Sequence, residues 1–199
     1  MIKITKLLFA MAFLFLSFMT VLVPIIQEYH GAQASPAMVI YPDPEFYQAT
    51  PGAKLGDYYL AYPGILPDHP LYWVKMIRDR IVLTLTAEPV ARWQLLLLYA
   101  DKRIGAAQVL VKGNKVSLGA VTATKAEKYM DQALGQLEKL KSQGKMTAMI
   151  ADQAIKACAK HQEITSQLVN ISNQEKDLLS QALEISQNNL KRALQIVGR

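Results

Sequence analysis

The sequence is poor in the residue types that carry most enzyme chemistry. It has one cysteine, Cys158, and three histidines. A single cysteine excludes an intrachain disulfide, so the fold must rest on packing alone. The sequence has no H-E-x-x-H, C-x-x-C-H, Walker or dinucleotide motif, and it lacks the paired E-x-x-H motifs of a di-iron bundle. We therefore predict no enzyme activity, no catalytic residue, no metal site and no cofactor.

Basic residues are in modest excess over acidic residues, and they are not concentrated in any one segment. The net charge is +6, and removal of residues 1–34 would take away Lys3, Lys6 and Glu28 and leave +5. The lysines are spread along the chain and never form a run, which indicates a solvated surface. The alternative is a patch for an anionic partner such as lipid or wall polymer. Nucleic acid is not a predicted partner.

The amino terminus holds the one long hydrophobic run. Lys3 and Lys6 precede the apolar tract Leu7–Ile26, and a polar turn leads to the A-x-A sequence Ala32–Ala34. This layout predicts a secretory signal that is cleaved after Ala34. The alternative is an uncleaved membrane anchor, because about 20 apolar residues can span a bilayer. Both predict an extracytoplasmic domain, since the two lysines stay inside.

Proline is scarce after residue 70, and this scarcity divides the chain. Seven of the nine prolines lie in residues 35–70. We predict an extended Pro/Tyr-rich segment over residues 35–69 that packs along the folded part with its rings inward. A spacer or a proline-rich recognition strand are the alternatives. The predicted organisation is thus 1–34 signal peptide or anchor, 35–69 extended segment and 70–199 helical bundle.

Strand-like alternation of useful length is missing, and apolar residues recur instead at helical spacing. The pattern predicts helices over about 70–85, 89–112, 117–143, 147–171 and 172–197. Thr86 is the expected cap of the second helix, and S-N-Q-E at 172–175 is the expected capping box of the last. The prediction is an all-α fold, an elongated antiparallel bundle of about five helices preceded by the extended segment and the hydrophobic export helix.

The first of these helices has a clear apolar arc, which we expect to pack in the bundle. Polar Lys75, Asp79 and Arg80 lie outside the arc. The arc consists of Trp73, Val74, Ile77, Ile81, Thr84 and Leu85.

A turn-rich motif stands directly before this helix, and we interpret it as a fixed structural corner. Its residues are Pro63, Gly64, Leu66, Pro67, Asp68 and Pro70. Pro70 suits the first helical position, and Asp68 could accept a first-turn N–H. Ligand or metal binding by Asp68 and His69 is the alternative.

The stretch from residue 58 to about 140 resembles an uncharacterised bacterial family, a domain of unknown function. The resemblance is carried by P-G-x-L-P-D-x-P-[LF]-Y-x-x-K at Pro63–Lys75 and by an L-T-x-x-P turn at Leu85–Pro89. An L-x-x-A-x-x-R-[IL]-x-x-A helix follows at Leu97–Ala107. The resemblance implies an exported or membrane-anchored helical domain, and it supplies no catalytic residue.

Two single residues in the fourth predicted helix could carry chemistry. His161 lies in the apolar stripe, where we expect a neutral histidine bonded to a neighbour, with a ligand or pH-switch role as the alternative. Cys158 flanks the stripe and is expected to pack as a small hydrophobe.

The leading functional hypothesis is a non-enzymatic cell-envelope module that binds another envelope protein; the sequence does not define its oligomeric state. A chaperone-like stress adaptor is a weaker version, because L-T-A-E-P only approaches the L-T-x-x-Q repeat of helical chaperones. The second class is a sensor bundle with an apolar pocket between helices. Its weak pocket candidates are Trp73, Trp93, Tyr99, Tyr129 and His161.

Overall fold

The structure is a computed structural model that describes residues 58–172 and 175–198. These residues form five helices and no strand. The predicted export segment, the cleavage site after Ala34 and residues 35–57 of the Pro/Tyr-rich segment lie outside the described residues. No helix in the described ranges is long and apolar enough to cross a membrane.

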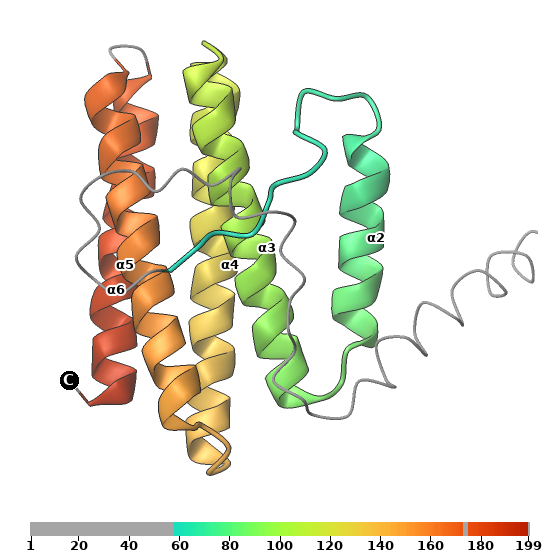
Figure 1. Ribbon diagram of the computed structural model, residues 1–199, viewed down its shortest axis with the longest axis vertical. Coiled ribbons are helices and arrows are strands. Elements are labelled where there is room, and N and C mark those ends of the chain that lie inside the picture. Colours follow the sequence, from blue (N-terminus) through green and yellow to red (C-terminus); the bar gives the residue numbers. More distant parts are fainter. Residues whose placement is uncertain (1–57, 173–174, 199) are drawn as a thin grey trace, which may run out of the picture. The chain divides into compact units, whose positions relative to one another are not determined.

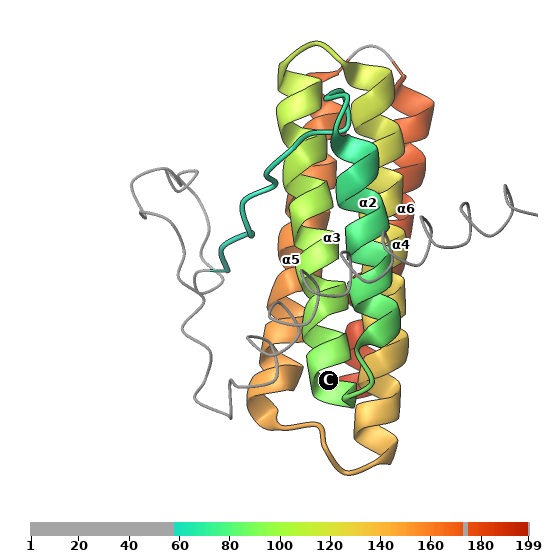
Figure 2. The same cartoon turned by 90° about the vertical axis from the view of Figure 1, so that its right-hand side faces the viewer.

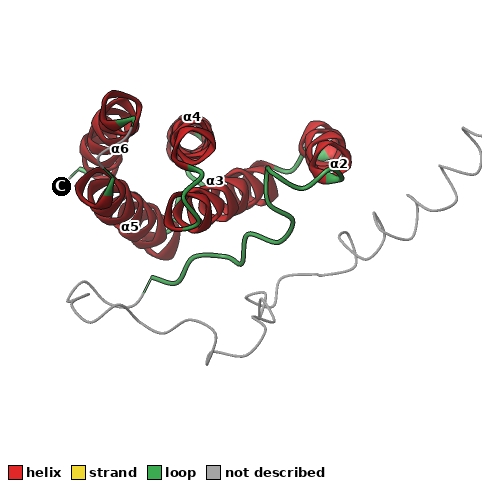
Figure 3. Ribbon diagram, turned by 90° about the horizontal axis from the view of Figure 1, so that it is seen from above, coloured by secondary structure: helices red, strands yellow, loops and turns green. Residues whose placement is uncertain are grey.

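Four long helices pack as a bundle, and a shorter helix lies beside them (Figure 1). The short helix, α2, spans Tyr72–Leu85, and among the described helices it contacts only α3. The bundle comprises α3 (Pro89–Lys112), α4 (Val116–Ser142), α5 (Ala148–Ile171) and α6 (Lys176–Val197). Successive helices run in opposite directions, as predicted. Seen from above, α2 stands apart on the far side of α3 from α5 and α6 (Figure 3).

The predicted helix ends are right for α3 and α5. α3 has Pro89 in its first turn and Gly113 as its carboxyl-terminal cap. The Thr147 hydroxyl accepts a hydrogen bond from the Ile150 N–H at 3.3 Å and caps α5.

Three of the predicted helix caps and starts are wrong. Glu88 caps α3, because its carboxylate accepts from Ala91 N–H at 2.5 Å, whereas Thr86 instead ends α2. α2 begins at Tyr72, two residues after Pro70, since residues 67–71 form a turn. The predicted start of the last helix is wrong, because α6 begins at Lys176, and Glu175 precedes it with a φ of 51° and no side-chain cap bond.

The interior of the bundle is divided into two apolar halves by a layer of polar residues. One cluster contains Trp93 and Leu137, and the other contains Ile104 and Leu168. On α3, α4 and α5 the change from one cluster to the other falls at Asp101, Glu127 and His161. This placement puts the polar side chains at one level of the bundle, where they can meet.

α3 and α4 approach each other closely near the loop that joins them. A Cβ added at Gly119 of α4 would lie 2.5 Å from Val111 Cγ2 and 3.2 Å from the Ala107 carbonyl oxygen of α3. A side chain does not fit in that space unless its neighbours move. Gly119 therefore permits the tight packing of this helix pair.

The described end of the Pro/Tyr-rich segment, residues 58–63, lies along the bundle (Figure 2). Ala61 is buried, and Leu60 packs on the second apolar cluster. Pro63 lies over Gly105 of α3, whose added Cβ would be 3.8 Å from Pro63 Cδ. The tyrosine side chains of this segment differ in exposure. Tyr58 is partly buried, whereas Tyr59 and Tyr62 are exposed, at 50% and 52%. The expected inward packing therefore holds for part of this segment.

Candidate functional site

The short helix α2 presents its apolar arc to solvent, which reverses the predicted orientation. Trp73 is 59% exposed and Ile77 51%, and Val74 and Leu85 are exposed as well. The one buried residue of α2 is Asp79, at 2% exposure. The pattern identified the arc correctly, but the expectation that it packs into the bundle is wrong.

The polar side of α2 is held by a buried arginine on α3. Arg103 Nη2 lies 4.0 Å from Asp79 Oδ2, and Arg78 donates to Asp79 Oδ1 at 2.7 Å. Successive residues of a helix are about 100° apart, so Asp79 points away from the middle of the arc by about 180°. A contact between Asp79 and α3 therefore turns the apolar arc outward.

Arg103 is itself fixed by two tyrosines. Its guanidinium lies 4.1 Å from the ring centroid of Tyr129 and 5.6 Å from that of Tyr99, and Nη1 donates to the Tyr99 carbonyl oxygen at 3.1 Å. The two rings meet edge to face with centroids 6.0 Å apart. Stacking on aromatic faces stabilises a desolvated arginine. The arginine thus offers Asp79 a rigid positive partner.

The two ends of α2 are tied down by cations that donate to backbone oxygens. Lys75 Nζ donates to the carbonyl oxygens of Pro63, at 2.6 Å, and Ile65, at 3.1 Å. Burial lowers the pKa of Lys75 to about 8. At the other end, Arg92 of α3 donates to the Leu83 carbonyl oxygen at 2.5 Å. Both contacts keep α2 at a fixed angle to α3.

The turn-rich motif contains the turns that precede α2, and the atoms that hold it differ from those expected. Gly64 has a φ of 66°, which favours glycine. The expected Asp68 cap is wrong, because Asp68 pairs with Lys115 at the start of α4, and this hydrogen bond lowers the pKa of Asp68. His69 serves the turn instead, since its Nδ1 accepts from the Leu71 N–H at 3.1 Å.

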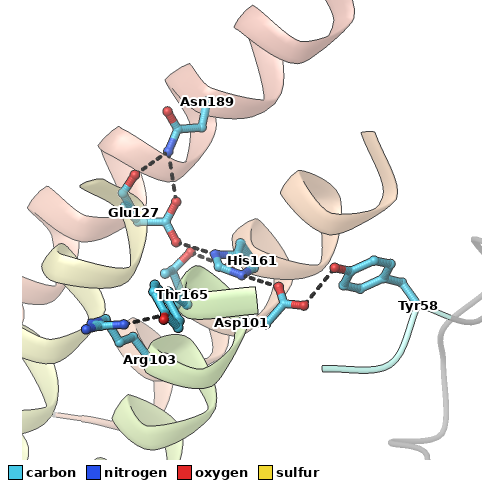
Figure 4. Close-up of polar contacts among 8 residues, drawn as sticks. Tyr58, Asp101, Arg103, Glu127, His161, Thr165 and Asn189 are labelled. Carbon is cyan, nitrogen blue, oxygen red and sulfur yellow. Dashed lines mark hydrogen bonds and ion pairs between the residues drawn. The ribbon is translucent and has the colours of Figure 1, made fainter. Parts of the chain in front are cut away.

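The polar layer inside the bundle joins four helices through a buried histidine (Figure 4). Nδ1 of His161, on α5, lies 2.9 Å from Glu127 Oε1 of α4, and its Nε2 lies 3.1 Å from Asp101 Oδ1 of α3. Asn189 of α6 donates to Glu127 Oε2 at 3.1 Å. Tyr58 Oη donates to Asp101 Oδ2 at 2.7 Å. We call these five residues the polar layer.

His161 carries a positive charge at neutral pH. Burial alone lowers the pKa of its imidazole, but the carboxylates of Glu127 and Asp101 outweigh burial and raise it to about 9. The prediction of a neutral histidine is therefore wrong. We expected a neutral histidine because the sequence shows no partner close to His161. Both partners are on other helices and are therefore distant in the sequence.

The polar layer has the geometry of a structural ion cluster. His161 and Glu127 are fully buried, and the described residues contain no group of three His, Cys, Asp or Glu side chains arranged to hold a metal ion. Cys158 is buried in the apolar cluster as expected, and burial raises the pKa of its thiol. A thiol in such a place is a poor nucleophile.

The sequence did contain a signal for the polar layer. Asp101 lies four residues after Leu97 and three before Ile104, both of which are buried. Glu127 has the same spacing to buried Ala123 and Met130. A carboxylate at this spacing lies on the apolar face of its helix. These two positions could have been identified as buried carboxylates, although their meeting at His161 could not.

The predicted pocket residues do not gather at one place. Trp93 is 1% exposed in the first apolar cluster, with Tyr129 packed against that cluster. Tyr99 faces Tyr129, and the guanidinium of Arg103 lies against both rings. Trp73 is on the outer face of α2, and His161 belongs to the polar layer.

Comparison with protein families matches residues 64–198 to the family described as Domain of unknown function (DUF5667), so the chain belongs to this family. The match covers the corner motif from Gly64 onward and all five described helices. No curated protein and no solved structure matches the chain.

Proposed function

We propose that this chain is a non-enzymatic interaction module of the cell envelope, in which the outer face of α2 is the docking surface. The observation that carries the proposal is the inverted orientation of α2, with apolar residues in solvent and a carboxylate inside. Exposure of a contiguous apolar arc is costly in water and is typical of interaction sites. We name the apolar residues of this arc the outer face; Trp73, Val74, Ile77 and Leu85 are exposed and Ile81 is half-buried.

The inversion is supported by specific contacts. Asp79 meets Arg103, Arg103 is stacked on Tyr129, and Lys75 and Arg92 tie the two ends of α2. A helix that packed its apolar arc on α3 would leave Arg103 buried without this carboxylate, which is unfavourable. The bundle therefore selects the orientation that exposes the outer face.

The bundle itself supplies a rigid support for this surface. α3–α6 enclose two apolar clusters with the polar layer between them. The polar layer binds its own members together and offers no exposed nucleophile. This division of roles supports an interaction module. The sensor and chaperone-like hypotheses stay predictions, and so does the extracytoplasmic location.

In-cell photocrosslinking tests the docking surface. A benzophenone amino acid is placed at Ile77 in the full chain, and at Met149 as the matched control, since both are exposed, at 51% and 69%, on different helices. We expect one dominant adduct from position 77 that position 149 does not form. Equal adducts at the two positions, or none at position 77, would contradict the proposal.

A second variant separates docking from folding. A benzophenone at Val74, which is 46% exposed, is combined with Ile77→Asp. The charged side chain should abolish the adduct while the thermal midpoint is unchanged, because Ile77 is in solvent. An adduct that persists would show that the outer face does not dock.

A further inference from the structure

We infer that the partner of the outer face is an anionic membrane surface, on which α2 lies parallel to the bilayer. This inference rests on the proposed function, because it names the occupant of the same surface. It is argued from the order of charges around α2, from the length of α2 and from the apolar tract in the same chain.

Two arginines flank the outer face on its two sides. At about 100° per residue, Arg80 lies about 20° before Trp73 around the helix, and Arg78 lies about 20° beyond Leu85. Both arginine side chains are exposed, and the Arg78 side chain is 64% accessible. An apolar arc with cations along both edges is the pattern of a helix that lies in a membrane interface.

The outer side of α2 has no negative charge to oppose such a surface. Asp79 is the one acidic residue between Tyr72 and Leu85, and it is buried against Arg103. Arg78 donates to Asp79, whereas Arg80 carries its charge on the exposed edge beside Trp73. An anionic membrane surface supplies negative charge all along that edge, whereas a protein groove would need an acidic group placed at it.

The composition of the outer face agrees with an interfacial position. Trp73 is the most exposed large apolar residue of α2, and tryptophan is enriched where a membrane meets water. The apolar surface continues past the start of α2 through Leu71 and Ile65, which are 54% and 43% exposed. α2 has 14 residues and is about 21 Å long, too short to cross a hydrocarbon core of about 30 Å.

The same chain carries a segment that would take it to a membrane. If the apolar tract Leu7–Ile26 is kept as an uncleaved anchor, it is long enough to span a bilayer, and residues 27–57 join it to the described part of the chain. At a maximum of about 3.3 Å per residue, this connection can reach about 100 Å, which is enough to let α2 meet the surface of the same membrane. Tethering would raise the effective concentration of the outer face at that surface.

The two tryptophans of the chain provide a direct test. Trp73 lies on the outer face and Trp93 in the core, so Trp93→Phe leaves a reporter of docking and Trp73→Phe leaves a matched buried control. Each full-length chain is reconstituted into vesicles of phosphatidylglycerol and phosphatidylcholine whose acyl chains are brominated. We expect Trp73 emission to shift to the blue and to be quenched at least about threefold more than Trp93 emission.

Charge dependence identifies the lipid. Arg80→Gln should lower the ratio of docked to free α2 about fivefold, as expected for loss of one cation near an anionic surface. Lys125→Gln, which removes an exposed cation from α4, should leave the ratio unchanged. Vesicles of phosphatidylcholine alone should quench Trp73 less. If Trp93→Phe fails to fold, the unaltered chain is compared with Trp73→Phe, and the difference gives the Trp73 signal.

The outcomes separate this inference from the proposed function. Unquenched Trp73 in anionic vesicles, together with a protein adduct at position 77 in cells, would overturn the lipid inference and leave the docking surface standing. Unquenched Trp73 without any adduct at position 77 would overturn both. Quenching that is equal for Trp73 and Trp93 would also contradict the inference, because it would not arise at the outer face.

Discussion

The interior of the bundle and the exterior of α2 reverse the usual distribution of polarity. Inside α3–α6, a charged histidine and two carboxylates occupy the centre, and on α2 a tryptophan and branched aliphatic residues face water. Each of these buried polar groups has a hydrogen-bonding partner, with the two carboxylates on either side of one imidazole ring. The exposed apolar residues have no such compensation among the described residues.

The difference between the two regions shows how polar contacts decide orientation in this molecule. In the bundle, one layer of polar side chains requires that four helices meet at one level, and any axial shift would separate His161 from its carboxylates. In α2, the single contact of Asp79 with Arg103 decides which side of the helix faces α3. Apolar burial drives the packing of α3–α6, while charge pairs select the level at which those helices meet and the side of α2 that faces α3.

The largest effect should come from removing one carboxylate of the polar layer. Glu127→Ala leaves the His161 cation with less compensation and should lower the free energy of unfolding by about 3–5 kcal/mol. Glu138→Ala on the same helix removes an exposed carboxylate, 48% accessible, that pairs with Arg192, and it should cost at most about 1 kcal/mol. Urea unfolding measures both. Equal losses would mean that the polar layer does not select the packing of α3–α6.

The next effect is the pH dependence of stability from His161. Its folded pKa of about 9 is above the ordinary value of 6.5, so the stabilisation is complete below about pH 6.5 and is lost as pH rises through 9. We expect a loss of about 3 kcal/mol between pH 6 and pH 10.

A chain with His30→Gln and His69→Gln keeps His161 as its one histidine, and the same chain with His161→Gln is the control. NMR titration should place the His161 transition near pH 9. The unfolding free energies of the two chains should converge above that pH. A His161 transition at or below pH 6.5 would show that the imidazole is neutral in the fold.

A smaller effect concerns helix packing without charge. Gly119→Ala forces a methyl group against Val111 and should lower the unfolding free energy by about 1–3 kcal/mol. Gly135→Ala, on the same helix, meets only the end of the Arg192 side chain at 3.7 Å, and it should be neutral or stabilising by up to about 1 kcal/mol. Thermal unfolding compares the pair. A stable Gly119→Ala variant would mean that α3 and α4 can separate at little cost.

The smallest effect should be on the outer face. Ile77→Ala should change the unfolding free energy by no more than about 0.5 kcal/mol, because the side chain is already in water. Ile104→Ala, in the fully buried second apolar cluster, should cost about 2–5 kcal/mol. If Ile77→Ala destabilises the chain to a similar extent, α2 packs its apolar arc inward and the inversion is refuted.

Helical periodicity was sufficient to predict much of the fold. It placed five helices, the ends of α3 and α5, and the buried stripes of the bundle, because burial repeats along a helix with a fixed angle. It also identified the apolar arc of α2. Whether that arc faces the bundle or solvent depends on the contact of Asp79 with Arg103, which is distant from α2 in the sequence. The caps were the weakest part, since Thr86 and Glu88 are both suitable and only the folded chain shows which one is used.

The polar layer shows a second limit of the sequence. His161 was noticed because it interrupts an apolar stripe, whereas Asp101 and Glu127 do the same on other helices and were passed over. Both contact His161 at distances of about 3 Å, although the contacting residues are 34 and 60 positions apart in the sequence. Helical spacing predicts which face of each helix is buried. It does not predict which residues of two different helices will lie side by side along the bundle.

The hydrogen bond from Tyr58 to Asp101 has a mechanical consequence. Tension on the chain ahead of residue 58 reaches Tyr58 before it reaches α2, and this bond transmits the load to the middle of α3, where Asp101 is also a partner of His161. The contacts of α2 with Arg103 and Arg92 lie downstream of that point and are shielded from the pull. A chain tethered at its amino terminus would therefore yield first at the polar layer, while the outer face kept its orientation.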